Sequence, residues 1–139
     1  MSITPYLLYQ NVAGALKFLS RAFGFRKFGK PMTSQGGKVI HAAMKLGNNV
    51  IMMGYPGSKY RNPKRLGQAT QSLYVTVKDA DKHFTRAKKA GAKILEEPND
   101  TFYGDRRYGA EDPEGHQWYF AHRLTRAVRK RASKVKSEA

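Results

Sequence analysis

The hydrophobic residues of this chain follow two periods, one typical of strands and one typical of helices. A run of apolar and β-branched residues from Ile3 to Gln10 predicts a first strand. The segment VAGALKFLSRAFGF then carries apolar residues at helical spacing, with Asn11 as its N-cap and Gly24 at its end. Strand-like runs separated by Gly- and Asn-containing turns follow, so a βαβββ order is predicted. These three strands are expected at residues 25–31, 38–46 and 50–55.

A loop and a second copy of the same order come next. Residues 56–68, PGSKYRNPKRLGQ, are rich in Gly, Pro and basic residues, which predicts the loop. A strand is expected at residues 72–77. A helix should begin after its N-cap Asp79, continue to Ala90 and end at Gly91.

The last strands of the second copy are predicted to form a hairpin. After a strand at residues 92–97, two strand-like runs between Phe102 and His122 flank the sequence DPEG. Pro suits an early position of a turn, and Gly can take the positive φ that closes it. We therefore predict one domain over residues 1–122, with modules at 3–55 and 70–122 and a linker at 56–69.

A βαβββ module has one helix and can cover only one face of its sheet. The predicted fold class is therefore α+β, in which two modules pair their curved mixed sheets around a cleft and place the helices on the outer faces. Alternation supports this arrangement in the last strand, where Trp118 and Phe120 should face the helix. Gln117 and Tyr119 should then face the cleft.

Composition and charge limit the function classes. The chain has 139 residues, a formal net charge of +16 and no cysteine. The charge predicts attraction to anionic small molecules, anionic membranes or nucleic acid. The lack of cysteine favours a reducing cytoplasm, and no apolar run approaches the length of a membrane span. We expect a cytoplasmic protein that is not inserted in a membrane.

The segment 123–139 has a composition of its own. It holds seven Lys or Arg residues and one acid, Glu138, with only a sparse apolar stripe. This pattern is typical of a solvated basic tail or a marginal basic helix. The alternative is a contact with nucleic acid through the tail and the basic loop at residues 59–65, with strongly salt-dependent affinity.

Four stretches of the chain resemble a known superfamily. They are TPYLLYQNVAGALKFLSRAFGF, VIHAAMKLGNNVIMMG, LYVTVKDADKHFTRAKKAGAKI and FYGDRRYGAEDPEGHQWYF. Their order resembles that of the vicinal oxygen chelate superfamily, which includes glyoxalase I, bleomycin-resistance proteins and extradiol dioxygenases, and the similarity is greatest to its PhnB-like branch. The resemblance implies a paired βαβββ fold that is frequently a homodimer.

The resemblance also implies where a metal would be held. Metal-dependent members use His and Glu side chains near the start of the first strand and on the last strand of each module. Here those positions correspond to Thr4, Met52, Ser72 and Tyr119. Divalent transition metals prefer imidazole nitrogen and carboxylate oxygen, and a thioether suits only soft metals. We therefore predict no metal and no other cofactor.

The candidate ligand-binding residues are mostly uncharged side chains expected on the cleft side. His41 and Tyr119 are also candidate catalytic acid–base groups, although a structural role for His41 is an equal alternative. Arg106 and Arg107 could clamp an anion, or Arg106 could pair locally with Asp105. His83 is expected at the surface of its helix. The candidate ligand-binding residues are Thr4, Tyr6, His41, Met52, Ser72, Tyr74, Arg106, Gln117 and Tyr119.

The predicted function is binding of a small molecule without a metal. The ligand should be aromatic or anionic, because a strongly cationic protein repels cations. The alternatives are a lyase or a dioxygenase-type enzyme of the same superfamily, or a nucleic-acid contact through the basic tail.

Overall fold

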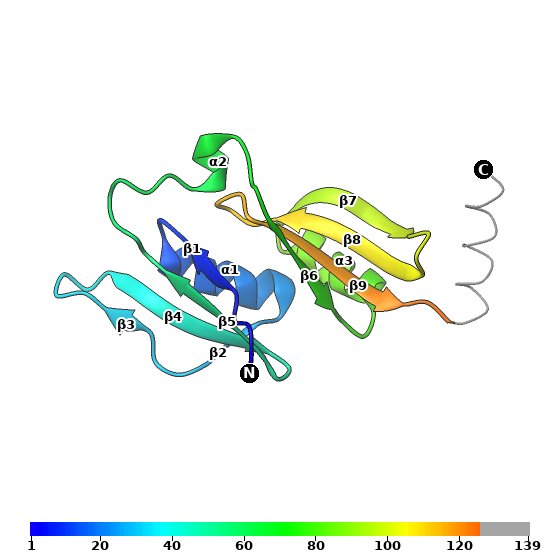
Figure 1. The fold of residues 1–139 in the computed structure, drawn as a ribbon, viewed down its shortest axis with the longest axis horizontal. Helices are drawn as coiled ribbons and strands as arrows, with labels where there is room; N and C mark the ends of the chain where they lie inside the picture. The colour runs from blue at the N-terminus through cyan, green and yellow to red at the C-terminus, as the bar shows by residue number, and fades with distance from the viewer. Residues whose placement is uncertain (126–139) are drawn as a thin grey trace. The chain divides into compact units, whose positions relative to one another are not determined.

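The computed structural model describes residues 1–125, which form two compact units, each with a sheet and a long helix (Figure 1). The first unit comprises residues 1–69 together with 112–116, and the second comprises residues 70–111 together with the strand that begins at Gln117. The two sheets have five and four strands, which confirms the predicted α+β class. Of the predicted basic tail, residues 126–139 lie outside the described residues.

The first unit is built on a mixed sheet. Its strand order is β1-β5-β4-β2, and the short β3 also pairs with β4. β1 pairs with β5 in parallel, whereas the other pairs are antiparallel. The elements are β1 (Tyr6–Leu8), α1 (Val12–Phe23), β2 (Arg26–Lys27), β3 (Met32–Thr33), β4 (Val39–Leu46), β5 (Asn49–Gly54) and α2 (Pro63–Leu66).

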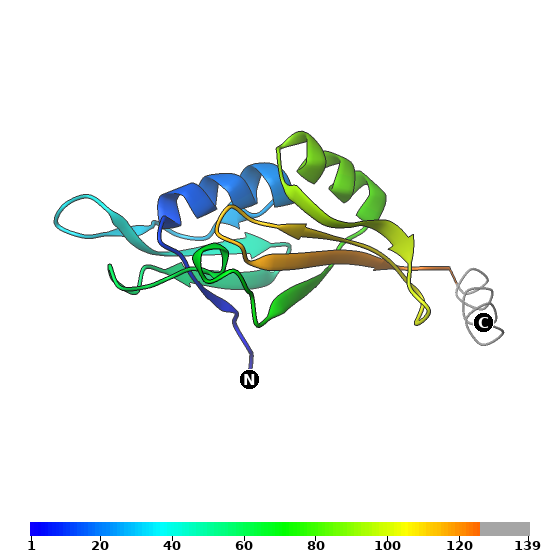
Figure 2. The same ribbon diagram turned by 90° about the horizontal axis from the view of Figure 1, so that it is seen from above.

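The helix α1 has the ends that its sequence predicts. The Asn11 side chain accepts a hydrogen bond from the backbone N–H of Gly14, and Gly24 takes a left-handed conformation with φ 82°. The apolar face of α1 is buried beside β4, where Met44 is fully buried, as is Met53 on β5. In each unit the long helix lies on one side of its sheet (Figure 2). We call the opposite side of each sheet its open face.

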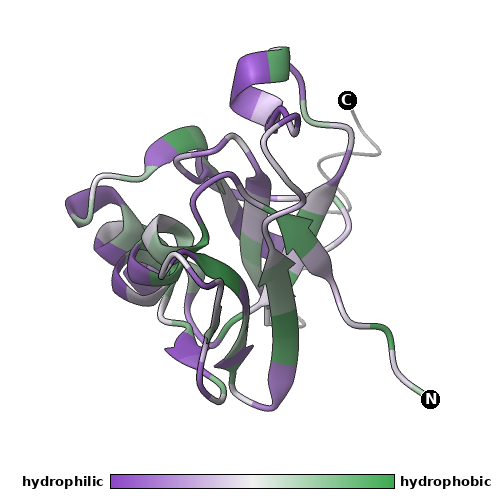
Figure 3. Ribbon diagram, turned by 90° about the vertical axis from the view of Figure 1, so that its left-hand side faces the viewer, coloured by the Kyte–Doolittle hydropathy of each residue, from purple (hydrophilic) through white to green (hydrophobic). Residues whose placement is uncertain are grey.

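The second unit repeats the arrangement with four strands in the order β6-β9-β8-β7. Tyr108, Trp118 and Phe120 are fully buried on the side of α3, whereas Gln117 and Tyr119 are only partly buried. The alternation predicted for the last strand is thus confirmed. Figure 3 shows much of the hydrophobic green on the strands and purple along the helices. The elements are β6 (Ser72–Thr76), α3 (Ala80–Lys89), β7 (Lys93–Asp100), β8 (Asp105–Glu111) and β9 (Gln117–Arg123).

The strand register makes positions in the two units equivalent. Tyr6 on β1 lies opposite Met52 on β5, and Tyr74 on β6 lies opposite Tyr119 on β9, in parallel pairs of the same kind. The adjacent antiparallel pairs extend the equivalence, so that β4 corresponds to β8 and β5 to β9.

Three local features differ from the sequence prediction. The segment 56–68 contains the one-turn helix α2, which the Asn62 side chain caps by accepting from the backbone N–H of Arg65. The predicted strand 25–31 is reduced to the two residues of β2. His83 was wrongly expected at the surface, because its ring packs 4.1 Å from that of Phe120 and its Nδ1 hydrogen-bonds with the Tyr108 hydroxyl.

The turn between β8 and β9 is part of the first unit. The buried Tyr9 hydroxyl donates to Asp112 Oδ2 over 2.6 Å. The Glu114 carboxylate accepts from the backbone N–H groups of Gln10 and Asn11, over 2.6 and 2.8 Å, and from Asn62 Nδ2 over 2.9 Å. These bonds satisfy both buried carboxylates of the turn, which offsets the desolvation of their charges.

Candidate functional site

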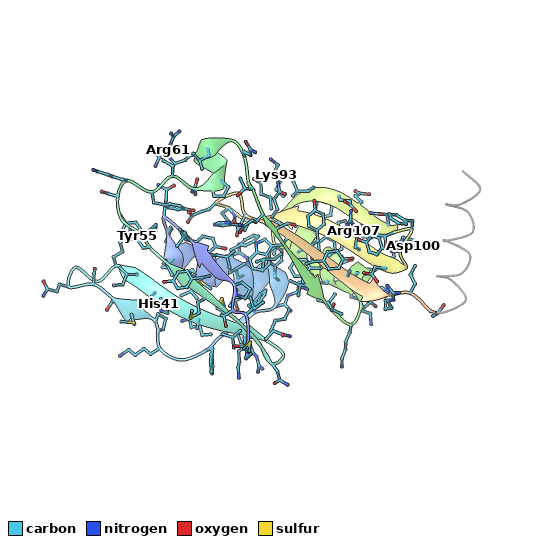
Figure 4. The ribbon with its side chains drawn as sticks, in the orientation of Figure 1. His41, Tyr55, Arg61, Lys93, Asp100 and Arg107 are labelled. Carbon is cyan, nitrogen blue, oxygen red and sulfur yellow. The ribbon has the colours of Figure 1, made fainter. Side chains whose placement is uncertain are left out.

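The open face of the first unit is aromatic and apolar. Tyr6 on β1 is about half exposed, and its ring crosses Gly54, where an added Cβ would lie only 2.5 Å from the Tyr6 hydroxyl oxygen. His41 on β4 lies directly opposite Gly54, and its ring is tilted against that of Tyr6 with centroids 5.7 Å apart. His41 is labelled on β4 in Figure 4. Met52 is partly buried on the same face, opposite Tyr6.

Thr4 lies just before this sheet. It is exposed, and the next residue, Pro5, accepts a hydrogen bond from the backbone N–H of Met52 over 2.9 Å. The structure therefore brings Tyr6, His41 and Met52 together on one face and places Thr4 at its border. A hydroxyl, an imidazole, a thioether and two rings can contact a flat ligand and supply a few hydrogen bonds.

The open face of the second unit is a polar network with aromatic members. The Tyr74 hydroxyl donates to Asp105 Oδ2 over 2.8 Å and lies 3.2 Å from the Tyr103 hydroxyl. Arg107 Nη1 donates to the Tyr103 hydroxyl over 2.9 Å, and Arg123 pairs with Asp105 at 3.1 Å. Partial burial, followed by the hydrogen bonds with Tyr103 and Asp105, raises the pKa of the Tyr74 phenol, so Tyr74 is neutral at physiological pH.

Arg107 is the charged centre of this network. Its Nε donates to Glu96 Oε1 over 2.8 Å and its Nη2 to Glu96 Oε2 over 3.2 Å, which makes a bidentate ion pair. Its guanidinium carbon lies 5.1 Å from the centroid of the Tyr119 ring. The hydrogen bonds to Glu96 raise the pKa of Arg107 and lower that of Glu96. Arg107 therefore stays charged beside an aromatic face.

The other candidates of the second unit lie on the same face. Ser72 and Gln117 are opposite each other on β6 and β9. The Tyr119 ring crosses Gly109, where an added Cβ would lie 2.6 Å from a ring carbon. A tyrosine over a glycine thus occurs on both open faces, with Tyr6 over Gly54 in the first unit.

Arg106 is placed apart from these residues, on the side of the sheet that carries α3. It pairs with Asp81 of α3 at 3.1 Å and with Asp100 of β7 at 3.2 Å. Arg106 and Arg107 were both predicted as a possible anion clamp, but only Arg106 was among the predicted ligand-binding residues. Strand alternation could have indicated Arg107. Arg106 lies on the same side of β8 as the buried Tyr108, and Arg107 lies on the opposite side.

The equivalence of the units places His41 and Arg107 at the same position of the open faces. His41 pairs with Gly54 across β4 and β5, and Arg107 pairs with Ala121 at the matching place across β8 and β9. One position thus carries an imidazole in the first unit and a guanidinium in the second. Tyr103 and Glu96 around Arg107 were missed from sequence because their bonds depend on a loop and a strand register. Asp105, predicted as a possible partner of Arg106, pairs with Arg123 instead.

Comparison with known proteins establishes the family. Residues 4–120 match the model of the Glyoxalase/Bleomycin resistance protein/Dioxygenase superfamily. The chain belongs to this superfamily.

The relatives of this superfamily member include proteins of mycobacteria. It is 32% identical over 122 residues to the uncharacterized protein Rv0887c of Mycobacterium tuberculosis, covering 84% of this chain and 71% of that protein. Among solved structures, TioX of a Micromonospora species has 31% sequence identity and a TM-score of 0.73, and the match covers 89% of this chain and 99% of TioX.

A fosfomycin resistance protein shares the fold at lower identity. FosX of Listeria monocytogenes has 15% identity and a TM-score of 0.62, over 92% of this chain and 94% of that one. That FosX structure contains Mn(II) and a dihydroxypropylphosphonic acid. At this identity the similarity concerns the fold alone.

The residues that the sequence resemblance assigns to the family's metal positions do not fit such an ion. Thr4, Met52, Ser72 and Tyr119 offer two hydroxyls, a thioether and a phenol in place of imidazoles and carboxylates. Within residues 1–125, no group of three or more His, Cys, Asp or Glu side chains is arranged to hold a metal ion. Among the same residues, no helix is long and apolar enough to cross a membrane.

Proposed function

We propose that this protein binds a small aromatic or anionic molecule without a metal, through the open faces of its sheets. The proposal rests on Thr4, Met52, Ser72 and Tyr119, which the sequence resemblance assigns to the family's four metal positions and which are not usual ligands of a divalent transition metal. Such a donor set leaves no basis for chelation followed by electrophilic catalysis. Aromatic rings with hydroxyl groups at their edges instead support stacking and directional hydrogen bonds.

Arg107 supports an anionic group on the ligand. Glu96 and Tyr103 occupy its Nε, Nη2 and Nη1, yet a guanidinium has five N–H donors, so donors remain for a carboxylate or phosphate. The side chain is 28% exposed and lies over Tyr119, so an anionic aromatic compound could contact the cation and the ring together.

We also propose, on the basis of the sequence resemblance, that the protein belongs to the PhnB-like branch and forms a homodimer.

A ligand screen with matched variants tests the proposal. Aromatic carboxylates and their neutral amides would be added to protein purified without a His-tag, and the melting temperature would be measured with Mn²⁺, with Zn²⁺ and with a chelator. We expect carboxylates to stabilise the protein by about 2.7 kcal/mol at a hundredfold excess over their Kd, and the amides at the same concentration to stabilise it less. Metal and chelator should leave the shift unchanged.

The variants assign the shift to a face. Arg107→Gln should weaken carboxylate binding by about tenfold, the loss expected for a charged hydrogen bond. Lys93→Gln is the control, because it also removes the cation of an ion pair, at the start of β7, and should bind normally. One transition-metal ion per chain, whose removal lowers the melting temperature, would refute metal independence.

A further inference from the structure

Acidic residues are distributed very unevenly between the two units. Residues 1–69 contain eleven Lys or Arg and not one Asp or Glu. The described second unit, residues 70–111 and 117–125, contains nine basic and seven acidic residues. The ion pairs of Lys93, Arg106, Arg107 and Arg123 all lie in that second unit.

The carboxylates of the first unit do not neutralise its surface. They are Asp112 and Glu114 of the inserted turn, which are only 5% and 9% exposed. Both are engaged by internal donors, namely the Tyr9 hydroxyl, the Asn62 amide and backbone N–H groups. Two carboxylates against eleven basic residues leave this unit with a net positive field.

The basic residues are densest in the segment 59–65, where Lys59, Arg61, Lys64 and Arg65 are all exposed. Hydrogen bonds to other parts of the first unit hold this segment in place. The Tyr60 hydroxyl donates to the Leu8 carbonyl over 2.9 Å, and the backbone N–H of Lys64 donates to the Glu114 carbonyl over 3.0 Å. Figure 4 shows the Arg61 side chain extending away from the ribbon. A fixed backbone presents the four cations outward with little further loss of backbone entropy on binding.

We propose that the segment 59–65 is a binding surface for the phosphate backbone of single-stranded nucleic acid. Arg61 and Arg65 can contact phosphate oxygens in bidentate geometry, and Lys59 and Lys64 add point charges. Base-reading in a duplex groove needs an inserted helix or ribbon, whereas α2 has four residues. A flexible single strand can instead follow a short basic loop.

An anionic membrane is the less favoured polyanion. Peripheral helices bind membranes by burying an apolar face between the lipids. In the described part of the chain the apolar face of α1 is already buried against its own sheet, and Leu66 is a single exposed apolar side chain on α2, too little to form such a face. The nucleic-acid proposal does not depend on the small-molecule function, because it uses a different segment.

Fluorescence anisotropy with a labelled single-stranded oligonucleotide of about 20 nucleotides, at several NaCl concentrations, tests this surface. The full chain would be compared with two variants of equal charge. The first is K59Q/R61Q/K64Q/R65Q, and the matched control is K78Q/K82Q/K88Q/K89Q, which removes four exposed lysines of the second unit. Circular dichroism would verify that all three proteins are folded.

We expect the first variant to make the slope of log K against log salt less negative by about 3, because each phosphate contact that is lost contributes about 0.7 to its magnitude in a single strand. Its affinity at low salt should fall at least about tenfold, whereas the control should change the slope by less than about 1. Equal losses in both variants, or no oligonucleotide binding by the parent protein, would overturn the proposal. Tighter binding of the parent protein to phosphatidylserine vesicles than to the oligonucleotide would also overturn it.

Discussion

The ion pair between Glu96 and Arg107 makes part of the stability depend on pH. Hydrogen bonds from Arg107 lower the pKa of Glu96 in the folded protein, although partial burial acts in the opposite direction. Because the folded pKa lies below the unfolded one, the contribution is fully present above the ordinary Glu pKa of about 4.3. It is lost as the pH falls through the lowered folded pKa.

Glu96→Gln should therefore destabilise the protein at neutral pH and have little effect near pH 3. The Glu96 side chain is 29% exposed, so we expect only about 1 kcal/mol, or about 3 °C in melting temperature. Thermal melts between pH 7 and pH 3 measure the difference. Glu97→Gln is the control, because Glu97 is an exposed neighbour. A loss that is equal at all pH values would contradict the assignment to this ion pair.

Single positions show what a sequence can and cannot locate. Periodicity placed Tyr74 and Tyr119 on the open face, because alternation needs no knowledge of distant residues. The same rule applied to β8 would have chosen Arg107 over Arg106. Periodicity could not have predicted that His83 packs against Phe120, because an imidazole among charged helix residues gives no hydrophobic signal.

The turn between β8 and β9 is an element whose geometry requires glycine. Gly115 has φ 92°, and an added Cβ would lie 2.5 Å from the backbone nitrogen of Lys64. Gly57 has φ 116° with no atom within 4 Å of such a Cβ. Both glycines avoid the left-handed penalty of about 1–2 kcal/mol, but only Gly115 also avoids a backbone clash.

Gly115→Ala should therefore lower the melting temperature by about 10 °C, from about 3 kcal/mol of combined backbone strain and overpacking. Gly57→Ala should lower it by about half as much, because it carries the strain alone. Differential scanning calorimetry of both variants and of the parent protein measures the two shifts in melting temperature. Equal shifts would mean that the turn moves to accommodate the added methyl group and that the close approach to Lys64 adds nothing to the cost in stability.

Elements with local signals were predicted well, and elements that depend on distant partners were not. The caps of α1 and α3 and the hairpin turn follow from short-range rules, so their positions are confirmed. α2 is too short for periodicity, and its cap Asn62 also donates to Glu114, which is 52 residues away in sequence. The shared cleft and the site set built on it stay predictions, because nothing within one unit tests them.

At the scale of the whole molecule, charge distribution opposes folding of the first unit more than of the second. Eleven basic residues in residues 1–69 repel one another without an acidic residue in that range. In the second unit, attractive pairs such as Lys93 with Glu111 act in the other direction. Exposed pairs are each worth about 0–1 kcal/mol, and salt weakens both effects.

Added salt should therefore stabilise this protein, because screening relieves more repulsion than it removes attraction. We expect the melting temperature to rise by a few degrees between roughly 20 and 200 mM NaCl, over which the Debye length falls from about 20 Å to about 7 Å. Neutralising Lys59, Arg61, Lys64 and Arg65 to Gln should reduce this rise. Neutralising Lys78, Lys82, Lys88 and Lys89 should reduce it less, because acidic neighbours already compensate that unit. A melting temperature that falls with salt would show that the ion pairs of the second unit outweigh the repulsion in the first.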